Sequence, residues 1–561
     1  MGSSPSSRNS GEIIMDFRAC FVLALVETTL ISILNPTHDI ISFLGTDGIR
    51  VIVVLSVLQW VALKTYRIFI YPTFFSPLRN ILGPKDNHFF LGQLVHLYRA
   101  STPIDHYVRW SSRWPDSPFI RYLTLANKEI LLINTVEAHR QVLQTKCYDF
   151  IKPQVMERLA GALAGKGLLF AKNHEHKKQR RMILNIFSAP NIKKLIPTFQ
   201  RAAEEMTIVI KGKLKEDIIG DIEFQEIFGN ITLNAIGATA LGTELENVQS
   251  AESGMGFVQY YYRMLSQLPL SALISFIHVY IPIRSFIPLE ANLGYIRAMK
   301  GVHSIIEKCI EERIRDLKTT DREKAGESES RDLLTYMIEE QESNDIKLSI
   351  EDIRGHLQNF LAGGHETATT ALSWATYILA TRPDVQDKLR AEVIDNLGVA
   401  GMPSYAAIER LHYLNNFFEE VTRLYAPAPI TLREAATDVV ICGQLLPKGT
   451  LLVLSAPVTN RSTRIWGADA LEFRPERWDS LTGDAATPYG TQTFANGPRM
   501  CIGRSYAVLI FKVMMIELLR NFRFSRSAEL TALGDREPPV LNPSVTWRLK
   551  HGMTVHVEEF A

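Results

Sequence analysis

The chain has 561 residues, of which 46% are hydrophobic and 22% are charged, so it can bury a large core and is not a disordered protein. Its 61 basic and 60 acidic side chains give a formal net charge of +1, which provides no attraction to nucleic acid, and none is expected as a partner. Five scattered cysteines without a CxxC pair fit neither a disulfide framework nor a zinc module. At about 150 residues per domain, the length would suggest roughly three to four domains.

The first 75 residues hold much of the hydrophobicity and are predicted to be a membrane anchor. The uncharged run 51–63 would rise about 20 Å as a helix, short of a bilayer core of about 30 Å, whereas residues 49–71 are long enough to span one. A second candidate span, residues 19–34, contains Glu27, whose charge is costly at mid-bilayer. The earlier run is therefore either a second span or an interfacial helix.

The charges around these runs predict the orientation of the anchor. The loop between the runs carries mainly Asp39 and Asp47, whereas the second run is followed by a set of basic residues, Lys64, Arg67, Arg79 and Lys85. The positive-inside rule then places everything after residue 71 in the cytosol. The alternative, that residues 51–71 form a buried core helix, stays open.

Beyond the anchor, the pattern predicts a helix-rich body with a minor sheet component. Strands are expected over residues 119–125 and 129–133 and around 439–454. Three prolines argue against a further continuous span over residues 264–289, which could instead be a pair of loops at the membrane surface. Residues 318–331 are expected to be a solvated surface loop.

One segment near the C-terminus points to chemistry. Cys501 lies in a glycine-rich turn directly before an apolar run, residues 505–519, that reads as a buried helix. A cysteine at a helix N-terminus is favoured as the thiolate, the form that binds a metal. Gly497 and Gly503 would let the backbone approach a flat cofactor closely, and Arg499 would supply a cation for an acidic cofactor edge. Alone, such a cysteine would usually be a small buried hydrophobic residue.

The ten residues 494–503 resemble the haem-binding signature FxxGxRxCxG of the cytochrome P-450 superfamily, with Phe494, Gly497, Arg499 and Cys501 at its fixed positions. The resemblance implies one large haem domain over residues 76–561, with the fold of that family, mainly α with a small β component. It also implies that Cys501 is the thiolate ligand of the iron in haem b, with Phe494, Gly497 and Arg499 in the cofactor site.

Two further stretches match the family in the expected order. Glu420 and Arg423 match its ExxR element, and residues 473–478 match the element whose arginine, here Arg477, completes a triad with that pair. The spacing from 420 to 423 puts acid and base on one helical face, although by itself it would suggest only a weak surface ion pair. By resemblance, the three side chains support the fold and do not take part in catalysis.

A fourth stretch lies inside a helix expected over residues 353–380. Gly363 and Gly364 each cost roughly 1 kcal/mol relative to Ala there, so a packing or functional reason is expected. Thr367 follows Gly363 by one turn, where its hydroxyl can bond the local backbone and leave a groove. By resemblance, Thr367 helps to deliver protons to dioxygen and Glu366 is the acid beside it. A helix kinked for packing alone is the alternative.

Weaker matches complete the expected site. His176 and Arg180 correspond to the WxxxR element of the family, with His in place of Trp, and Arg433 matches a strand arginine that contacts a haem propionate. For Arg433 the alternative is an ordinary solvated arginine. Segments expected to face the substrate from the family layout are a loop around residues 151–166, residues 360–362 and 428–432, and a turn near residues 550–553.

The resemblance implies a haem-thiolate monooxygenase that inserts one oxygen atom of O2 into a lipophilic substrate, with a terpenoid or other secondary metabolite as the expected class. Its electrons would come from a separate NADPH–cytochrome reductase, docking near Arg499, Arg504, Lys512 and residues 177–181, with cytochrome b5 as a further candidate partner. The expected location is the endoplasmic reticulum membrane, with the haem domain on the cytosolic face. A reductase-independent isomerase or dehydratase and a non-enzymatic haem protein are the alternatives.

Overall fold

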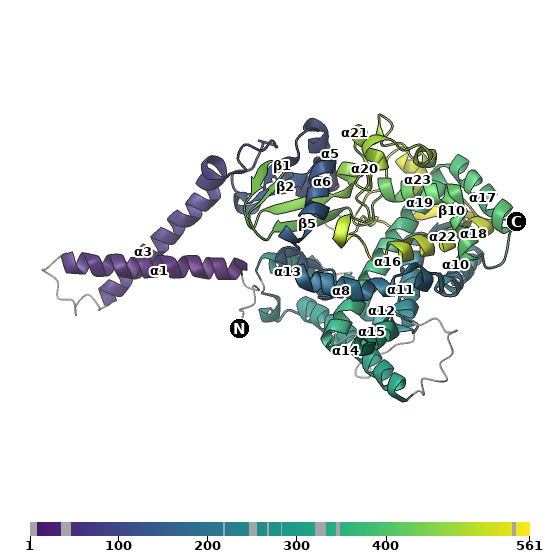
Figure 1. Ribbon diagram of the computed structural model, residues 1–561, viewed down its shortest axis with the longest axis horizontal. Helices are drawn as coiled ribbons and strands as arrows, with labels where there is room; N and C mark the ends of the chain where they lie inside the picture. Colours follow the sequence, from purple (N-terminus) through teal and green to yellow (C-terminus); the bar gives the residue numbers. More distant parts are fainter. Residues whose placement is uncertain are drawn as a thin grey trace.

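The computed structural model forms a helical body with a sheet at the end nearest to the N-terminal helices (Figure 1). It describes residues 8–34, 46–216, 219–245, 255–265, 269–281, 283–319, 332–343, 348–540 and 546–560.

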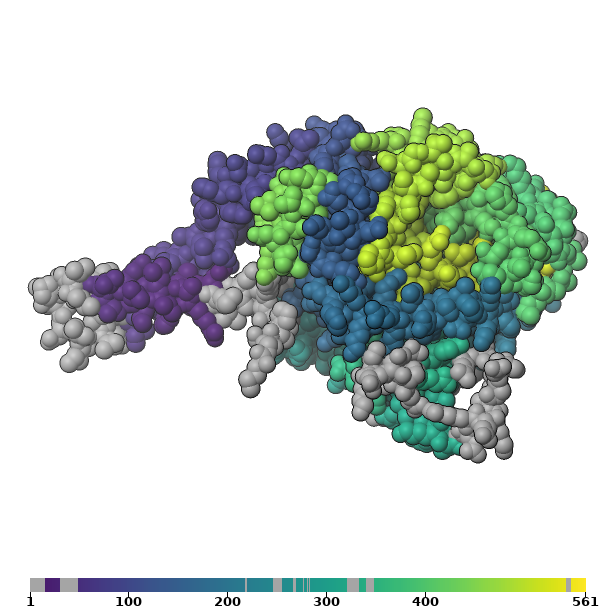
Figure 2. Space-filling model, viewed as in Figure 1, coloured from purple at the N-terminus to yellow at the C-terminus, as the bar shows by residue number. Residues whose placement is uncertain are grey.

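The N-terminal segment projects from the body as two helices side by side (Figures 1 and 2). They are α1 (Arg8–Leu34) and α3 (Thr46–Thr65), and α3 continues as a π-helix, η1 (Tyr66–Phe75). Within the described residues, Ile49–Phe75 is the one helix long and apolar enough to cross a membrane, and few of its residues are fully buried in the protein. This extends the span predicted over residues 49–71 by one turn.

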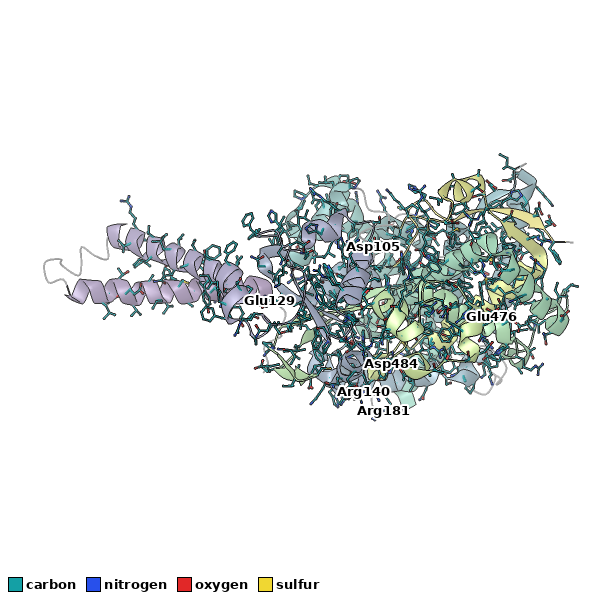
Figure 3. The ribbon with its side chains drawn as sticks, turned by 90° about the horizontal axis from the view of Figure 1, so that it is seen from above. Asp105, Glu129, Arg140, Arg181, Glu476 and Asp484 are labelled. Atoms are coloured by element: carbon teal, nitrogen blue, oxygen red, sulfur yellow. The ribbon has the colours of Figure 1, made fainter. Side chains whose placement is uncertain are left out.

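Polar side chains of α1 meet partners on α3. Gln59 Nε2 donates to the Glu27 carboxylate at 2.6 Å, and the carboxylate of Asp16 lies 2.9 Å from Lys64 Nζ and 2.7 Å from Arg67 Nη1. The acid at Glu27, costly for a helix inside a bilayer, is therefore hydrogen-bonded across the helix pair. At the base of the projection, Glu129 accepts from Ser76 Oγ at 2.8 Å (Figure 3).

A five-stranded mixed sheet has the order β1-β2-β8-β5-β3. Its strands are β1 (Phe119–Leu123), β2 (Glu129–Ile133), β8 (Leu451–Ser455), β5 (Ile430–Ala435) and β3 (Phe150–Ile151). β2 and β8 run parallel, and each other neighbouring pair is antiparallel. The pairing of β3 with β5 sets Ile151 opposite Glu434 and thus joins two segments that are far apart in the sequence.

Two smaller sheets lie elsewhere in the body. The first has three antiparallel strands, β4 (Asp221–Glu223), β10 (Thr554–Glu559) and β9 (Phe522–Ser525), and the second is a hairpin of β6 (Val439–Ile441) and β7 (Gln444–Leu446). The longer helices are α5 (Pro103–Arg113), α7 (Gln154–Ala164), α8 (Asn173–Ile186), α10 (Ile196–Glu216), α11 (Phe224–Leu241), α12 (Phe257–Leu265), α13 (Pro269–Tyr280), α14 (Glu290–Thr319), α15 (Leu333–Ser343), α16 (Ile350–Thr381), α17 (Pro383–Leu397), α19 (His412–Leu424) and α22 (Arg504–Asn521). Shorter helices are α4 (Leu94–Arg99), α6 (Val136–Arg140), α9 (Ala189–Lys193), α18 (Tyr405–Glu409), α20 (Ala456–Asn460), α21 (Thr463–Trp466) and α23 (Ala528–Leu533).

Helix α16 runs through the main core. It begins with a capping box, in which Ser349 Oγ accepts from the Asp352 N–H and the Asp352 carboxylate accepts from the Ser349 N–H. Its second half is buried on nearly all faces, and Trp374 stacks on Tyr425 with ring centroids 4.1 Å apart. A helix buried on all sides holds its residues rigidly, so this element can position a site.

Two expectations about local structure were wrong. Residues 264–289 include the helix α13 rather than only loops, because Pro269 takes the first helical position, where its missing N–H is harmless. Residues 151–166 likewise consist mainly of α7. In the expected surface loop, residues 318 and 319 end α14, and residues 320–331 lie outside the described residues.

Candidate functional site

The Cys501 segment folds into a closed turn ahead of α22. The Cys501 N–H donates to the Phe494 carbonyl at 2.8 Å, which brings the two ends of the motif together. Gly497 has φ 71°, and a Cβ there would lie 2.1 Å from the Leu143 carbonyl oxygen, so only glycine fits. The close approach at Gly497 is thus made toward the backbone of the short π-helix η3 (Gln141–Thr145). The Phe494 ring stacks on Phe418 of α19, with centroids 6.1 Å apart.

The Cys501 thiol is accessible but lies in a protein-dense region. Burial raises the pKa of the thiol, while the Gly503 N–H and the cations Arg180 and Arg504 act in the opposite direction. The side chain has accessible surface, so protein surrounds the thiol without covering it, as expected for a group that faces an internal space. The helix N-terminus alone therefore does not ionise Cys501, and a metal replacing its proton would be needed to hold it as the thiolate.

Basic side chains from three separate elements gather beside this turn. Arg433 on β5 is buried, and its Nη1 donates to the Leu432 carbonyl at 2.9 Å. Arg499 Nη1 donates to the Ala171 carbonyl at 2.9 Å, whereas its buried Nε and Nη2 atoms have no hydrogen-bond partner in the part of the chain that the structure describes. On α8, Arg180 Nη1 donates to the Met500 carbonyl at 2.8 Å, and the buried His176 lies one turn earlier on the same face.

These groups repel one another and have no acidic partner. Burial, and then Arg499, lowers the pKa of Arg433 to about 10. Burial lowers the pKa of His176 to about 3, with Arg499, Arg180 and Arg433 acting in the same direction, so His176 is neutral. Within the described residues, no ion pair joins Arg180, Arg433 or Arg499 to an Asp or Glu. Buried cations need an anion, and no side chain of this cluster supplies it.

The donor set fits the haem expected from the family resemblance. Its two propionates would complete the buried N–H groups of Arg499 and the hydrogen-bonding capacity of Arg433, and Cys501 is an axial ligand of the right type for its iron. His176 contacts Tyr148, whose hydroxyl lies 3.3 Å from Nδ1. A ring N–H of His176 could donate a hydrogen bond to a propionate.

The two glycines of α16 have different surroundings. A Cβ on Gly364 would lie 2.8 Å from Ile236 of α11, so this glycine is required for helix packing. Gly363 is exposed although it lies in the middle of a core helix, and a Cβ there would meet nothing within 4 Å. The Thr367 hydroxyl donates to the Gly363 carbonyl, one turn earlier. The helix is continuous through this point, and the opening at Gly363 lies where a side chain is missing.

Glu366 and its neighbours form a partly buried polar group next to Thr367. Burial raises the pKa of the Glu366 carboxyl, and Arg548 acts in the opposite direction. His365 is buried edge-on against Tyr261, with centroids 5.4 Å apart, and the Tyr261 hydroxyl has no hydrogen-bond partner within the described residues. A carboxyl with a raised pKa keeps a larger protonated fraction near neutral pH, as a proton donor requires.

The predicted triad is present and fully buried. Glu420 accepts from Arg423 Nε at 2.7 Å and Nη2 at 2.8 Å and from Arg477 Nε at 2.8 Å. Two further donors to this carboxylate were not expected from the sequence. They are Trp478 Nε1, at 3.0 Å, and the Arg474 N–H, at 2.9 Å. The triad ties α19 to the segment that precedes the Cys501 turn. Its buried geometry supports a structural role.

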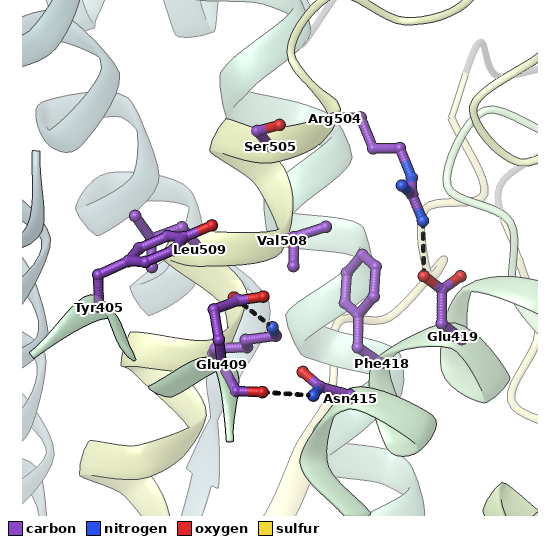
Figure 4. Close-up of a pocket in the computed structure, with 10 residues that line it drawn as sticks. Tyr405, Glu409, Asn415, Phe418, Glu419, Arg504, Ser505, Val508 and Leu509 are labelled. Atoms are coloured by element: carbon purple, nitrogen blue, oxygen red, sulfur yellow. Dashed lines mark hydrogen bonds and ion pairs between the residues drawn. The ribbon is translucent and has the colours of Figure 1, made fainter. Parts of the chain in front are cut away.

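The pocket shown in Figure 4 is not this site. It has a volume of about 260 Å³ and lies between α18, α19 and the start of α22. Its cations are paired, because Arg504 Nη2 lies 2.7 Å from the Glu419 carboxylate and the buried Lys512 Nζ lies 2.8 Å from Glu409. None of the residues predicted for the cofactor or for proton delivery lines this pocket.

Sequence reasoning missed several residues of the basic cluster. Cys147 and Tyr148 reach Arg499, and the Tyr148 ring lies 5.5 Å from its guanidinium carbon. Lys152 lies in the segment 151–166 that was expected to face the substrate, but it was not singled out as a neighbour of the arginines. No local pattern marks these three residues, because the pairing of β3 with β5 brings them to the site.

Comparison with known proteins gives a consistent assignment. The family model of cytochrome P-450 matches residues 82–550. The chain is 31% identical to the cytochrome P-450 monooxygenase FUM15 of Gibberella moniliformis, over 91% of this chain and 92% of that protein. It is 29% identical to the cytochrome P-450 monooxygenase sphH of Aspergillus fumigatus, over 85% of this chain and 89% of that protein. It is 26% identical to the cytochrome P-450 monooxygenase ALT8 of Alternaria alternata, over 90% of this chain and 93% of that protein.

Proposed function

This chain belongs to the cytochrome P-450 family and is an oxygenase, and from that premise we propose that it inserts one oxygen atom of O2 into a lipophilic small molecule. The second oxygen atom leaves as water, which requires two electrons and two protons for each turnover. The observation that carries this proposal is the open Cys501 thiol beside three arginines, one of them buried, that pair with no Asp or Glu among the described residues. Both features match what a haem-thiolate site demands.

We propose a role for each group of the site. When bound, the haem supplies the activation of dioxygen through its iron. Cys501 would be the thiolate that binds the iron. Arg499, Arg433, Arg180 and His176 would hold the propionates, and Phe494 and Gly497 would fix the turn that carries Cys501. These residues would orient the cofactor, because they would hold its charged edge from β5, α8 and the Cys501 turn.

Proton delivery would fall to Glu366 and Thr367. The Glu366 carboxyl, with its raised pKa, can hold a proton near the opening at Gly363. The Thr367 hydroxyl can relay it by accepting a proton on its oxygen and releasing its own, which in the resting structure is donated to the Gly363 carbonyl. This arrangement is needed only if dioxygen is reduced at the site. It therefore favours an oxygenase acting with a reductase over an isomerase or dehydratase.

Replacing Thr367 by Val should lower the product formed per NADPH by about tenfold or more, because positioned proton-transfer groups contribute factors of about 10² or more. Consumption of NADPH should continue, with hydrogen peroxide in place of product, and both can be measured by substrate-saturated turnover. Thr376→Val is the matched control, because Thr376 makes the same bond to the carbonyl one turn earlier, Leu372 at 2.9 Å, in a buried part of α16. An equal loss of product formed per NADPH consumed in both variants would contradict the role of Thr367.

We propose that electrons come from a separate NADPH–cytochrome reductase, with cytochrome b5 as a second candidate donor. The docking surface expected from the sequence needs revision, because Lys512 is buried and paired and Arg499 lies inside the basic cluster. The exposed side chains that remain are Lys177, Lys178 and Arg181 on α8 together with Arg504 (Figure 3 labels Arg181). In the space-filling view, the blue surface of this region borders the yellow C-terminal part of the chain (Figure 2).

The apolar helix Ile49–Phe75 supports a membrane anchor over residues 1–75, and we propose the cytosolic face of the endoplasmic reticulum as the location.

The substrate would be a terpenoid or another hydrophobic secondary metabolite. The function is tested by co-expression with an NADPH–cytochrome reductase and product analysis by mass spectrometry. If the protein is an oxygenase, the product should gain one oxygen atom from ¹⁸O2 and should form only when the reductase is present. An isomerised or dehydrated product formed without the reductase would overturn the proposal.

A further inference from the structure

The two helices of the N-terminal segment run side by side in opposite directions (Figures 1 and 3). In the first half of α1, the carboxylate of Asp16 lies 2.9 Å from Lys64 Nζ and 2.7 Å from Arg67 Nη1, near the end of α3. Further along α1, Glu27 meets Gln59, which comes earlier in α3. Positions that advance along α1 therefore meet positions that recede along α3, so the first helix follows the path of the second.

Small side chains make the contact between the two helices. Cys20, Ala24 and Thr28 recur at every fourth position of α1 and are at most 7% exposed, and Ser56 on α3 is fully buried. Thr28 Oγ1 donates to the Ala24 carbonyl at 2.5 Å, and Ser56 Oγ donates to the Ile52 carbonyl at 2.6 Å, so neither hydroxyl depends on water. Small residues with this spacing let two helices approach closely, which is how helices associate inside a bilayer.

The outward surface of the pair is apolar on both helices. Exposed apolar side chains on it include Phe21, Val22 and Leu25 of α1 and Val54, Leu58 and Val61 of α3. Glu27, the only acidic or basic residue of the run 19–34, is turned toward α3, where Gln59 Nε2 donates to its carboxylate at 2.6 Å. A helix that lies on a membrane surface needs a polar face toward water. The described part of α1 has the reverse arrangement, which fits a helix surrounded by lipid.

The length and the charges of α1 also suit a second crossing. Residues 18–34 rise about 25 Å as a helix, and Arg18 can reach the headgroups beyond a bilayer core of about 30 Å. Arg18, Lys64 and Arg67 all lie at the end of the pair that leads to the haem domain, whereas residues 47–50 at the other end carry one charge of each sign. Basic residues mark the cytosolic ends of spans, so one end of the pair is cytosolic for both helices.

We propose that α1 and α3 cross the bilayer together as an antiparallel hairpin, so that the N-terminus and the haem domain lie on the same cytosolic face. This inference rests on the membrane anchor of the proposed function and extends it from one span to two. The outward surface of the pair would contact the lipid chains. Inside the bilayer, the bond from Gln59 would satisfy the Glu27 carboxyl, which would be costly there without a partner. A single span would instead put the N-terminus on the opposite face from the haem domain.

The test is protease accessibility in microsomes that contain the full-length chain. A cleavage site for a sequence-specific protease, with an epitope tag, is inserted in separate versions before Met1, between residues 40 and 41, or after Ala561. Protease is added to intact vesicles and to vesicles opened with detergent, and cleavage is followed by immunoblot. The hairpin predicts that both terminal sites are cleaved in intact vesicles, whereas the site between the helices is cleaved only after detergent.

Two other patterns would contradict the hairpin in different ways. Protection of both the N-terminal site and the site between the helices in intact vesicles would show a single span, which would overturn the hairpin and leave the anchor in place. Cleavage of all three sites in intact vesicles would show that neither helix crosses, which would overturn the anchor as well. The spectrum of the reduced carbonyl adduct, measured on the same vesicles, reports the haem-thiolate function independently of either result.

A variant that lacks residues 8–34 is the matched control. It keeps α3 and the basic residues after it, so one span should remain with the haem domain still in the cytosol. Its N-terminal site should therefore change from cleaved to protected in intact vesicles. An N-terminal site that is cleaved equally in the full-length chain and in this variant would contradict the crossing of α1.

Discussion

Replacing Cys501 by Ser should abolish the red-shifted absorption band of the reduced carbonyl adduct and reduce product formation to the background of protein-free controls. The reason is the donor atom. A serine hydroxyl stays protonated under conditions in which an iron-bound thiol is deprotonated, so the strongly electron-donating axial ligand is lost. The measurement is the difference spectrum of the reduced, carbon monoxide-treated protein, with product analysis on the same preparation.

The control for this prediction is another cysteine. Cys309 on α14 is half-buried and lies outside the basic cluster, and burial raises the pKa of its thiol as it does for Cys501. Cys309→Ser should therefore keep both the band and the activity. A band that persists in Cys501→Ser, or one that disappears equally in both variants, would show that Cys501 is not the axial ligand.

The comparison of sequence and structure separates local from distant determinants. The Cys501 turn, the α16 segment around Thr367 and the strands at residues 119 and 129 were predicted because each depends on neighbours in the sequence. Position 497 needs glycine because of Leu143, more than 350 residues earlier, a reason that no local pattern contains. The motif was thus recognised correctly while the physical reason for one of its glycines was different.

The basic cluster makes the same point for the site. His176, Arg433 and Arg499 were identified by position in family motifs, but the absence of any acidic partner became apparent only when β5, α8 and the Cys501 turn were placed together. Lys152 belongs to no motif, and its partner Thr431 is 279 positions away in the sequence. Electrostatic properties of a site depend on every charge nearby, so they follow from the fold and not from spacing.

Replacing Glu420 by Gln should lower the free energy of unfolding by about 3–5 kcal/mol, the cost typical of breaking a buried ion pair by removing one partner. Glu420 is fully buried, and its two carboxylate oxygens accept from Arg423, Arg477, Trp478 and the Arg474 N–H. A neutral amide leaves both guanidinium groups buried without their counter-charge, and its NH2 would face donors. The measurement is urea unfolding of the detergent-solubilised protein, followed by circular dichroism.

Glu476→Gln is the matched control, because it lies in the same short helix as Arg477 but on the surface. Its carboxylate pairs with Lys388 Nζ at 2.7 Å, with both side chains about half exposed, so its loss should cost no more than about 1 kcal/mol. Arg423 also donates to the Asn460 and Ala470 carbonyls at 2.7 Å, so the buried carboxylate indirectly holds the segment leading to the Cys501 turn. Glu420→Gln should therefore also lose haem at lower urea concentrations than Glu476→Gln. If both variants retained haem equally, the triad would stabilise α19 but would not support the segment that leads to the Cys501 turn.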